Sequence, residues 1–281
     1  SPSRPACVSR RQVLLGGVTS LGRASLAQRG LGGKVHDGDG DDRRLVLIEL
    51  AGGNDGLSTI VPHGDDAYLA ARSATRIGPR AVLTLDDYRG FHPELKSLRA
   101  AWDRGQLAIV EGAGYPRQHR SHFLAREVWG TGSVQGREAG DGWLARLLAA
   151  RDPQHFTPAV HFGRNVPEHL RSASGQVRLL PDARAIDGRH AASVAYPDCD
   201  LGAQLRAAAA MLRDAAPPRL VSLTVPGFDT HADQREAHAR SWHTVDRSIG
   251  AFLHDLRGTP AGSRTVVMGL SEFDCSVATH R

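Results

Sequence analysis

The amino-acid sequence predicts an α/β fold, in which a mostly parallel β-sheet carries helices on both faces. Short runs rich in Val, Ile and Leu recur along the chain, and longer segments with helical periodicity fall between them. This alternation is typical of a parallel sheet, because parallel neighbours are joined by a crossover that usually contains a helix. The part of the chain after residue 43, about 240 of the 281 residues, is within the size of one domain.

The strand at residues 45–50 is the clearest element. Its sequence, LVLIEL, is almost entirely apolar, as expected for a strand buried on both faces. Runs of similar character predict further strands at 81–85, 106–110, 159–162, 219–225 and 264–270. The segments between the runs predict helices at 66–75, 93–104, 122–129, 142–150, 201–214 and 232–256.

The first 27 residues have the pattern of a twin-arginine signal peptide. Arg10 and Arg11 precede a modestly apolar, Gly-rich stretch, and Ser25-Leu26-Ala27 suits a signal peptidase. This pattern predicts recognition by the twin-arginine export machinery and a periplasmic or secreted location, with a basic disordered tail as the alternative. Residues 28–43 are Gly- and Asp-rich and predict a flexible linker; their Asp run lacks the closing glutamate of a calcium loop. The sequence contains no run of ~20 apolar residues, so we expect no membrane span after cleavage.

The charge distribution argues against nucleic-acid binding. The chain has 35 Lys and Arg against 30 Asp and Glu, but six of the basic residues and none of the acidic ones fall within residues 1–34. The remainder therefore has 29 basic and 30 acidic residues, without the basic stripe that nucleic acid requires. Cys199 and Cys275 either pair or remain as thiols.

The turn after the first strand is the first candidate site. Gly52 and Gly53 allow a sharp turn, and Asp55 then stands at the carboxyl end of the strand, where ligands collect in open α/β sheets. Asp55 is therefore a candidate metal ligand or base. The alternative is that Asn54-Asp55-Gly56 is simply a turn.

A second candidate follows the strand at 219–225. Asp229 and His231 are two residues apart beyond a strand end, and a carboxylate with an imidazole suits zinc, iron or manganese. His238 lies two helical turns further along the same face. The alternative is that Asp229 or Thr230 caps the next helix and that the histidines are surface residues.

The third candidate is the segment 115–123, which is rich in Arg and His. Arg117 and Arg120 lie at a strand-to-helix junction, where guanidinium groups and free helix N–H groups favour an oxyanion. Ser121 is either a nucleophile or a plain N-cap, and no Gly-x-Ser-x-Gly sequence surrounds it.

Motifs in these regions together resemble the exported domain of unknown function 1501 (DUF1501) family, across almost the whole chain. The motifs are Gly52-Gly53-Asn54-Asp55-Gly56-Leu57, Phe91-His92-Pro93-Glu94-Leu95, Gly112-Ala113-Gly114-Tyr115-Pro116 through Ser121-His122-Phe123 and Trp129, Gly140-Asp141-Gly142-Trp143-Leu144, Gly227-Phe228-Asp229-Thr230-His231, and Ser271-Glu272-Phe273. That family is similar to sulfatases and alkaline phosphatases. The resemblance implies an alkaline-phosphatase-like fold over residues 44–281, with Asp55, Asp229 and His231 as ligands of a divalent metal ion such as zinc, calcium, manganese or iron.

The end of the chain departs from the family pattern. Family members continue after Ser271-Glu272-Phe273 with Gly-Arg and, later, a Thr-Asp-His-Gly motif, whereas this sequence continues as DCSVATHR. We therefore expect late strands and the last metal ligands to be missing, with an unprotected sheet edge and weak or no activity.

These observations predict metal-assisted hydrolysis of a phosphate or sulfate ester as the ancestral chemistry, on an anionic small-molecule or polymer substrate. In that mechanism Asp55, Asp229 and His231 hold the metal and Arg117 or Arg120 stabilises the oxyanion. The alternative is a non-catalytic secreted protein that binds a polyanion or a protein partner and keeps the fold without the chemistry. Metal content distinguishes the two.

Overall fold

The computed structural model describes residues 42–115, 121–134, 140–151, 159–171, 177–186, 191–230 and 233–272. A five-stranded sheet with the order β6-β5-β7-β1-β8 forms its centre, and every ladder in this sheet is parallel. The predicted α/β class is confirmed. The sheet consists of β1 (Arg44–Leu50), β5 (Ala159–Phe162), β6 (Val177–Leu179), β7 (Leu220–Val225) and β8 (Thr265–Ser271).

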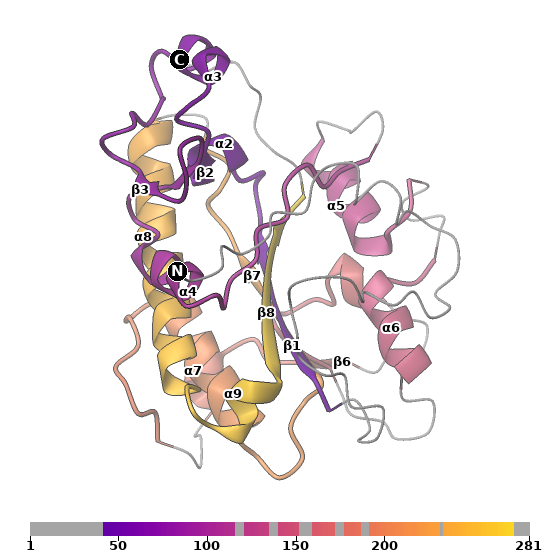
Figure 1. Ribbon diagram of the computed structural model, residues 1–281. Coiled ribbons are helices and arrows are strands. Elements are labelled where there is room, and N and C mark those ends of the chain that lie inside the picture. Colours follow the sequence, from indigo (N-terminus) through magenta and orange to yellow (C-terminus); the bar gives the residue numbers. More distant parts are fainter. Residues whose placement is uncertain are drawn as a thin grey trace, which may run out of the picture.

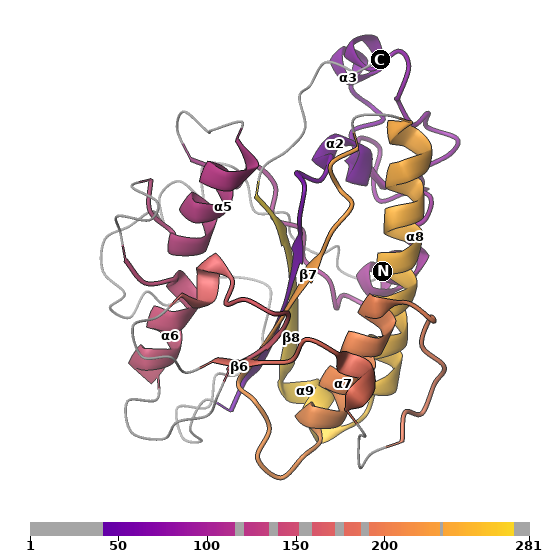
Figure 2. The ribbon, with the colours of Figure 1, turned by 180° about the vertical axis from the view of Figure 1, so that it is seen from behind.

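Helices cover both faces of this sheet (Figures 1 and 2). One face carries α4 (Lys96–Asp103), α7 (Asp200–Leu212), α8 (Gln234–Asp255) and α9 (Pro260–Arg264). The other face carries α5 (His122–Thr131) and α6 (Trp143–Arg151), with the 3-10 turn η2 (Glu168–Leu170) packed against them. The other helical elements among the described residues are α2 (Gly56–Thr59), α3 (Asp66–Ala71) and the 3-10 turn η3 (Ala183–Ala185).

The side chains of β1 alternate between two hydrophobic cores. Val46, Ile48 and Leu50 belong to the larger core, which includes residues of α7 and α8, whereas Leu47 belongs to a smaller core with residues of α6 and η2. Because successive strand residues point to opposite faces, Glu49 lies on the same face as Leu47. A carboxylate therefore stands in the layer between the sheet and α5 and α6.

Two predicted strands differ from the structure. Residues 106–110 form no strand: Leu107 and Ile109 pack against the larger core without a ladder, and Val110 is exposed. Alternate apolar residues can be buried in this way by any extended segment, so the pattern alone did not require a sheet partner. The predicted strand at 81–85 is reduced to β3 (Leu83–Thr84), which belongs to a separate antiparallel sheet with β2 (Ile60–Val61) and β4 (Gly90–Phe91).

Several predictions lie outside the described residues. They are the leader at 1–27, the linker as far as residue 41, and Cys275. Within the ranges described, no helix combines the length and the apolar character that crossing a membrane requires.

Candidate functional site

Three neighbouring strands end together at one edge of the sheet. β1 runs in register with β7 on one side and β8 on the other, so that Leu50 lies opposite both Val225 and Ser271. The segments after these strands leave the sheet at its carboxyl edge, next to the first turn of α5 (Figure 1). This edge is where open α/β sheets bind their ligands.

Gly52 brings the segment after β7 against the turn after β1. Its φ is +116°, and a Cβ atom at this position would lie 2.3 Å from the backbone nitrogen of Asp229. The N–H of Gly52 donates a hydrogen bond of 2.8 Å to Oε1 of Glu272. Both the backbone conformation and the close approach require glycine, and the glycine motif therefore determines how near Asp229 and Glu272 lie to β1.

His122, the first residue of α5, faces two carboxylates. Its Nδ1 lies 3.0 Å from Oε1 of Glu272, and its Nε2 lies 3.7 Å from Oδ1 of Asp229. The side chain of Glu272 is 1% exposed and that of Asp229 is 48% exposed. The imidazole thus joins a buried carboxylate to one that solvent and ligands can reach.

Arg126 lies one turn further along α5 and pairs with the buried Glu49. Its Nε is 3.4 Å from Oε1 of Glu49, and Oγ1 of Thr224 donates a hydrogen bond of 3.2 Å to Oε2 of the same carboxyl. Burial raises the pKa of Glu49 above its ordinary value, and the positive charge of Arg126 opposes that rise. Among the residues that the structure describes here, the carboxyls of Glu49, Asp229 and Glu272 accompany the guanidinium of Arg126.

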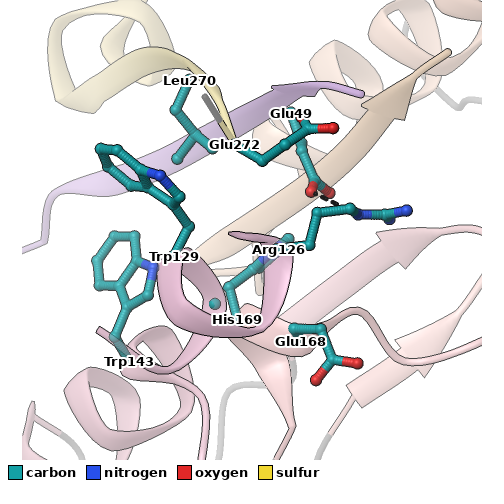
Figure 3. Close-up of a pocket in the computed structure, with 9 residues that line it drawn as sticks. Glu49, Arg126, Trp129, Trp143, Glu168, His169, Leu270 and Glu272 are labelled. Carbon is teal, nitrogen blue, oxygen red and sulfur yellow. Dashed lines mark ion pairs between the residues drawn. The ribbon is translucent and has the colours of Figure 1, made fainter. Parts of the chain in front are cut away.

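A narrow pocket lies directly beneath Glu49 and Glu272. Figure 3 shows two indoles on one side of it and Arg126 on the other. The helices α5 and α6 supply the indoles, and η2 supplies two further residues. The side chains labelled there are Glu49, Arg126, Trp129, Trp143, Glu168, His169, Leu270 and Glu272.

His169, which lines the pocket, and His161 share the hydroxyl of Ser222 on β7. Oγ of Ser222 lies 2.7 Å from Nε2 of His169 and 3.2 Å from Nδ1 of His161. Burial lowers the pKa of His161 to about 4. Burial, together with the charges of His161 and Arg126, lowers the pKa of His169 to about 3. Both imidazoles are therefore neutral at physiological pH.

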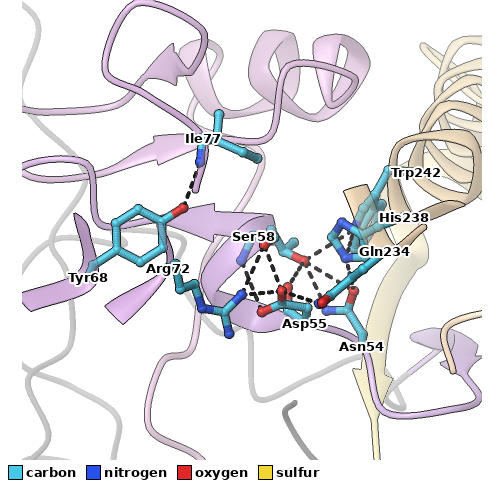
Figure 4. Close-up of polar contacts among 10 residues, drawn as sticks. Asn54, Asp55, Ser58, Tyr68, Arg72, Ile77, Gln234, His238 and Trp242 are labelled. Carbon is cyan, nitrogen blue, oxygen red and sulfur yellow. Dashed lines mark hydrogen bonds and ion pairs between the residues drawn. The ribbon is translucent and has the colours of Figure 1, made fainter. Parts of the chain in front are cut away.

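Asp55 serves a different network (Figure 4). Its carboxyl is fully buried, caps α2 by accepting from the backbone and hydroxyl of Ser58, and forms an ion pair with the buried Arg72. Nε2 of Gln234 on α8 donates a further hydrogen bond of 2.9 Å to Oδ2. Protein donors therefore surround both oxygens of this carboxylate.

The same network continues into α8. Oδ1 of Asn54 lies 3.0 Å from Nε2 of His238, and Nε1 of Trp242 donates to Oγ1 of Thr59 at 3.1 Å. Burial lowers the pKa of His238 to about 4, so the ring is neutral at physiological pH. These contacts fasten the turn after β1 to α8.

The predicted site residues are thus distributed over more than one place. Asp55 and Asp229 lie at the same edge of the sheet, but their carboxyls face different partners. Ser121 directly precedes α5, is exposed, and makes no side-chain capping bond. Arg117, Arg120 and His231 lie outside the described residues. Within the described ranges, no group of three His, Cys, Asp or Glu side chains is arranged to hold a metal ion.

Three residues at the site had no role assigned from the sequence: Glu49, Arg126 and Glu272. His122 was predicted only as part of the Arg- and His-rich segment 115–123, and its contacts with Glu272 and Asp229 were not foreseen. A signal existed for Glu49, because it is the one charge within the apolar run of β1. His122 and Arg126 are spaced four apart and therefore share a face of α5. The direction in which each side chain points depends on packing between distant elements, which the sequence does not state.

Comparison with known proteins finds one family. Residues 183–277 match the family model described as "Protein of unknown function (DUF1501)". No curated protein and no solved structure matches the chain significantly. The matched segment contains α7, β7, α8 and β8, and with them Asp229 and Glu272. The DUF1501 family predicted from the motifs is thereby confirmed, over residues 183–277 of this chain.

Proposed function

We propose that the protein is a metal-dependent hydrolase of phosphate or sulfate esters, with its site at the carboxyl edge of β1, β7 and β8. The observation that supports this proposal is the position of His122 between Glu272 and Asp229. The chain's own side chains there combine an imidazole, accessible carboxylate oxygen and a nearby guanidinium, which are the groups that such chemistry uses.

The spacing of two described side chains supports the proposal that a divalent cation binds here. Nε2 of His122 and Oδ1 of Asp229 are 3.7 Å apart, and two ligands that each lie ~2.0–2.2 Å from one ion have a separation of this order. Among the described residues, the carboxyls of Glu49, Asp229 and Glu272 outnumber the guanidinium of Arg126, and a cation would offset that negative charge. We infer that His231, which follows Asp229 by two residues, supplies a further ligand.

Glu272 would orient His122 for this role. A metal-binding histidine usually gives its second ring nitrogen to a carboxylate, which fixes the tautomer and the direction of the ring. Here the buried Oε1 of Glu272 holds Nδ1 of His122, and Nε2 is left on the side of Asp229. When bound, a divalent cation supplies Lewis-acid polarisation of the ester and activation of water.

Arg126 would bind the anionic part of the substrate. Its Nε faces Glu49, its side chain is 41% exposed, and the described residues offer it no other ion pair. The terminal nitrogens of a guanidinium held in this way can form two parallel hydrogen bonds to a phosphate or sulfate. Arg117 and Arg120 remain candidates for the same role.

We propose in addition that the protein is exported by the twin-arginine machinery to the periplasm or the exterior. The paired Arg10 and Arg11 ahead of a modestly apolar stretch support this proposal. Changing both to Lys should retain the protein in the cytoplasm. Efficient export of the Arg10→Lys/Arg11→Lys variant would contradict it.

The test of the hydrolase proposal is the turnover of p-nitrophenyl phosphate and p-nitrophenyl sulfate by the purified chain, after chelation and with zinc or manganese added back. We expect slow, cation-dependent turnover that falls at least tenfold in His122→Ala. His243→Ala is the matched control, because His243 is an exposed residue of α8 that pairs with Glu94.

Two outcomes would contradict the proposal. Turnover that survives both chelation and His122→Ala would place the chemistry elsewhere. Cation binding without turnover of either ester would favour the alternative, a secreted protein that keeps the fold without the chemistry.

A further inference from the structure

The pocket beneath Glu49 and Glu272 adjoins the proposed catalytic groups. Glu272 belongs to both places, because its Oε1 holds His122 while its side chain lines the pocket. In Figure 3 the indoles of Trp129 and Trp143 form one side of the pocket, and Arg126 lies opposite. A molecule whose anionic group lies at Arg126 and at a cation held by His122 and Asp229 would therefore have its remaining part near this pocket.

Trp129 has a buried hydrogen-bond donor without an acceptor. Its Nε1 is inaccessible to solvent, and no hydrogen-bond partner for it exists in the part of the chain that the structure describes. Buried donors are nearly always paired, because leaving one unpaired forfeits its hydration. An indole N–H can only donate, so the group that completes the pocket must offer an acceptor oxygen.

The two buried glutamates impose the opposite requirement. Ionised carboxylates accept hydrogen bonds and donate none, and Glu49 and Glu272 both line the pocket. A group that lies between them and Trp129 must therefore donate as well as accept. A hydroxyl does both. The pocket has room for a group of about the size of one hydroxyl, so the skeleton that carries the hydroxyl would remain outside it.

We propose that this pocket is a subsite for a hydroxyl of the substrate's alcohol portion, and that the substrate is a phosphate or sulfate ester of a polyhydroxylated alcohol, such as a sugar or polyol. The assignment depends on the proposed hydrolase function. It adds a substrate class, because an ester of a plain alkyl or aryl alcohol has no hydroxyl to offer Trp129, Glu49 and Glu272.

The test uses two esters that differ only in hydroxyl groups: glycerol 1-phosphate and n-propyl phosphate. Binding of each to the full chain is measured by calorimetry in the presence of manganese. We expect glycerol 1-phosphate to bind about fivefold more tightly, which is the effect of one additional hydrogen bond. The same preference is expected for the corresponding pair of sulfate esters.

Trp129→Phe isolates the indole N–H, because it keeps an aromatic ring and removes the donor. We expect this variant to bind both esters with affinities within twofold of each other, and to bind n-propyl phosphate as the unaltered chain does. Trp102→Phe is the matched control: Trp102 lies on α4, on the opposite face of the sheet, in edge contact with Phe91.

The outcomes separate the two proposals. Equal affinity of the unaltered chain for both esters overturns the hydroxyl subsite and leaves the hydrolase proposal intact. Binding of neither ester contradicts the hydrolase proposal, and the subsite with it. A preference that survives Trp129→Phe overturns the role of the indole. The comparison on the unaltered chain needs no variant, so it holds even if Trp129→Phe does not fold.

Discussion

Oε1 of Glu272 accepts hydrogen bonds from two directions, and one of them fixes His122. The backbone N–H of Gly52 donates from one side at 2.8 Å, and Nδ1 of His122 lies 3.0 Å away on another. Because the carboxyl is buried and anchored to the turn after β1, the imidazole has a defined direction at the first residue of α5. The geometry of the site therefore depends on contacts between the ends of β1 and β8.

Gly52→Ala should destabilise the fold strongly. The added Cβ would meet backbone atoms, the nitrogen of Asp229 at 2.3 Å and the carbonyl carbon of Phe228 at 2.9 Å, and neither can move freely. We expect the free energy of unfolding to fall by about 3 kcal/mol or more. Gly105→Ala is the control, since Gly105 also has positive φ but nothing lies within 4 Å of its added Cβ; the cost there should be about 1 kcal/mol. Urea titrations measure both values. An equal loss of unfolding free energy in the two variants would show that the close approach of Gly52 to Phe228 and Asp229 does not matter for stability.

Asp246→Ala should weaken the docking of α4 on α8. The buried carboxyl of Asp246 accepts from the backbone N–H groups of Ser97 and Leu98, at 2.9 Å each, and so caps a helix that has no side-chain cap of its own. We expect a loss of about 2 kcal/mol in the free energy of unfolding. Asp103→Ala removes an exposed ion pair with Arg99 on the same helix and should cost at most about 0.5 kcal/mol. A loss for Asp246→Ala no larger than for Asp103→Ala would contradict the capping role.

Arg72→Met should cost more than removing both members of the Arg72–Asp55 ion pair. Met leaves the fully buried carboxyl of Asp55 without its charge partner, and breaking a buried pair in this way costs about 3–5 kcal/mol. In the double variant Arg72→Met/Asp55→Asn no uncompensated charge remains, so we expect it to recover part of the free energy of unfolding that Arg72→Met loses. A double variant that is less stable than Arg72→Met would show that the charges do not oppose each other in this way.

Stability should decline as the pH falls below about 6.5, the ordinary pKa of histidine. Burial lowers the pKa of His161 and that of His238 to about 4, and the pKa of His169 to about 3. The unfolded chain therefore binds protons between about pH 6.5 and 4 that the folded chain does not, and folding loses up to about 1.4 kcal/mol per histidine per pH unit in that range. The raised pKa of Glu49 acts in the opposite sense.

Urea unfolding at pH 7.5, 6 and 5 measures this effect. His238→Gln should make the dependence on pH shallower, because it removes one of the titrating groups. A free energy of unfolding that stays constant from pH 7.5 to 5 would contradict the assignment of neutral buried histidines.

Periodicity was sufficient to predict the elements that bury a continuous apolar face. The predicted helices at 201–214 and 232–256 correspond to α7 and α8, and the strand at 45–50 to β1. The strands β2, β4 and β6 are two or three residues long, which is too short for a periodic signal. Residues 106–110 have the composition of a strand, but strand pairing is decided by tertiary neighbours that composition does not specify.

The site could be predicted only in part, for a related reason. Asp229 lies at the carboxyl edge of the sheet, as its place after a strand indicated. Asp55 has the same kind of place in the sequence, yet its carboxyl turns to Arg72, 17 residues further along the chain. Which way each carboxyl turns depends on α3 and α8 for Asp55 and on α5 for Asp229. Those packing partners are visible only in the fold.

The most direct test of the account is the affinity of the purified full chain for zinc and manganese, measured by calorimetry. We predict one bound ion, an affinity 10–100-fold lower in Glu272→Gln because His122 loses its orienting carboxylate, and no measurable binding in Asp229→Asn. Asp103→Asn, at an exposed carboxyl of α4, should bind as the unaltered chain does. Affinities unchanged in both Glu272→Gln and Asp229→Asn would contradict the site proposed at His122.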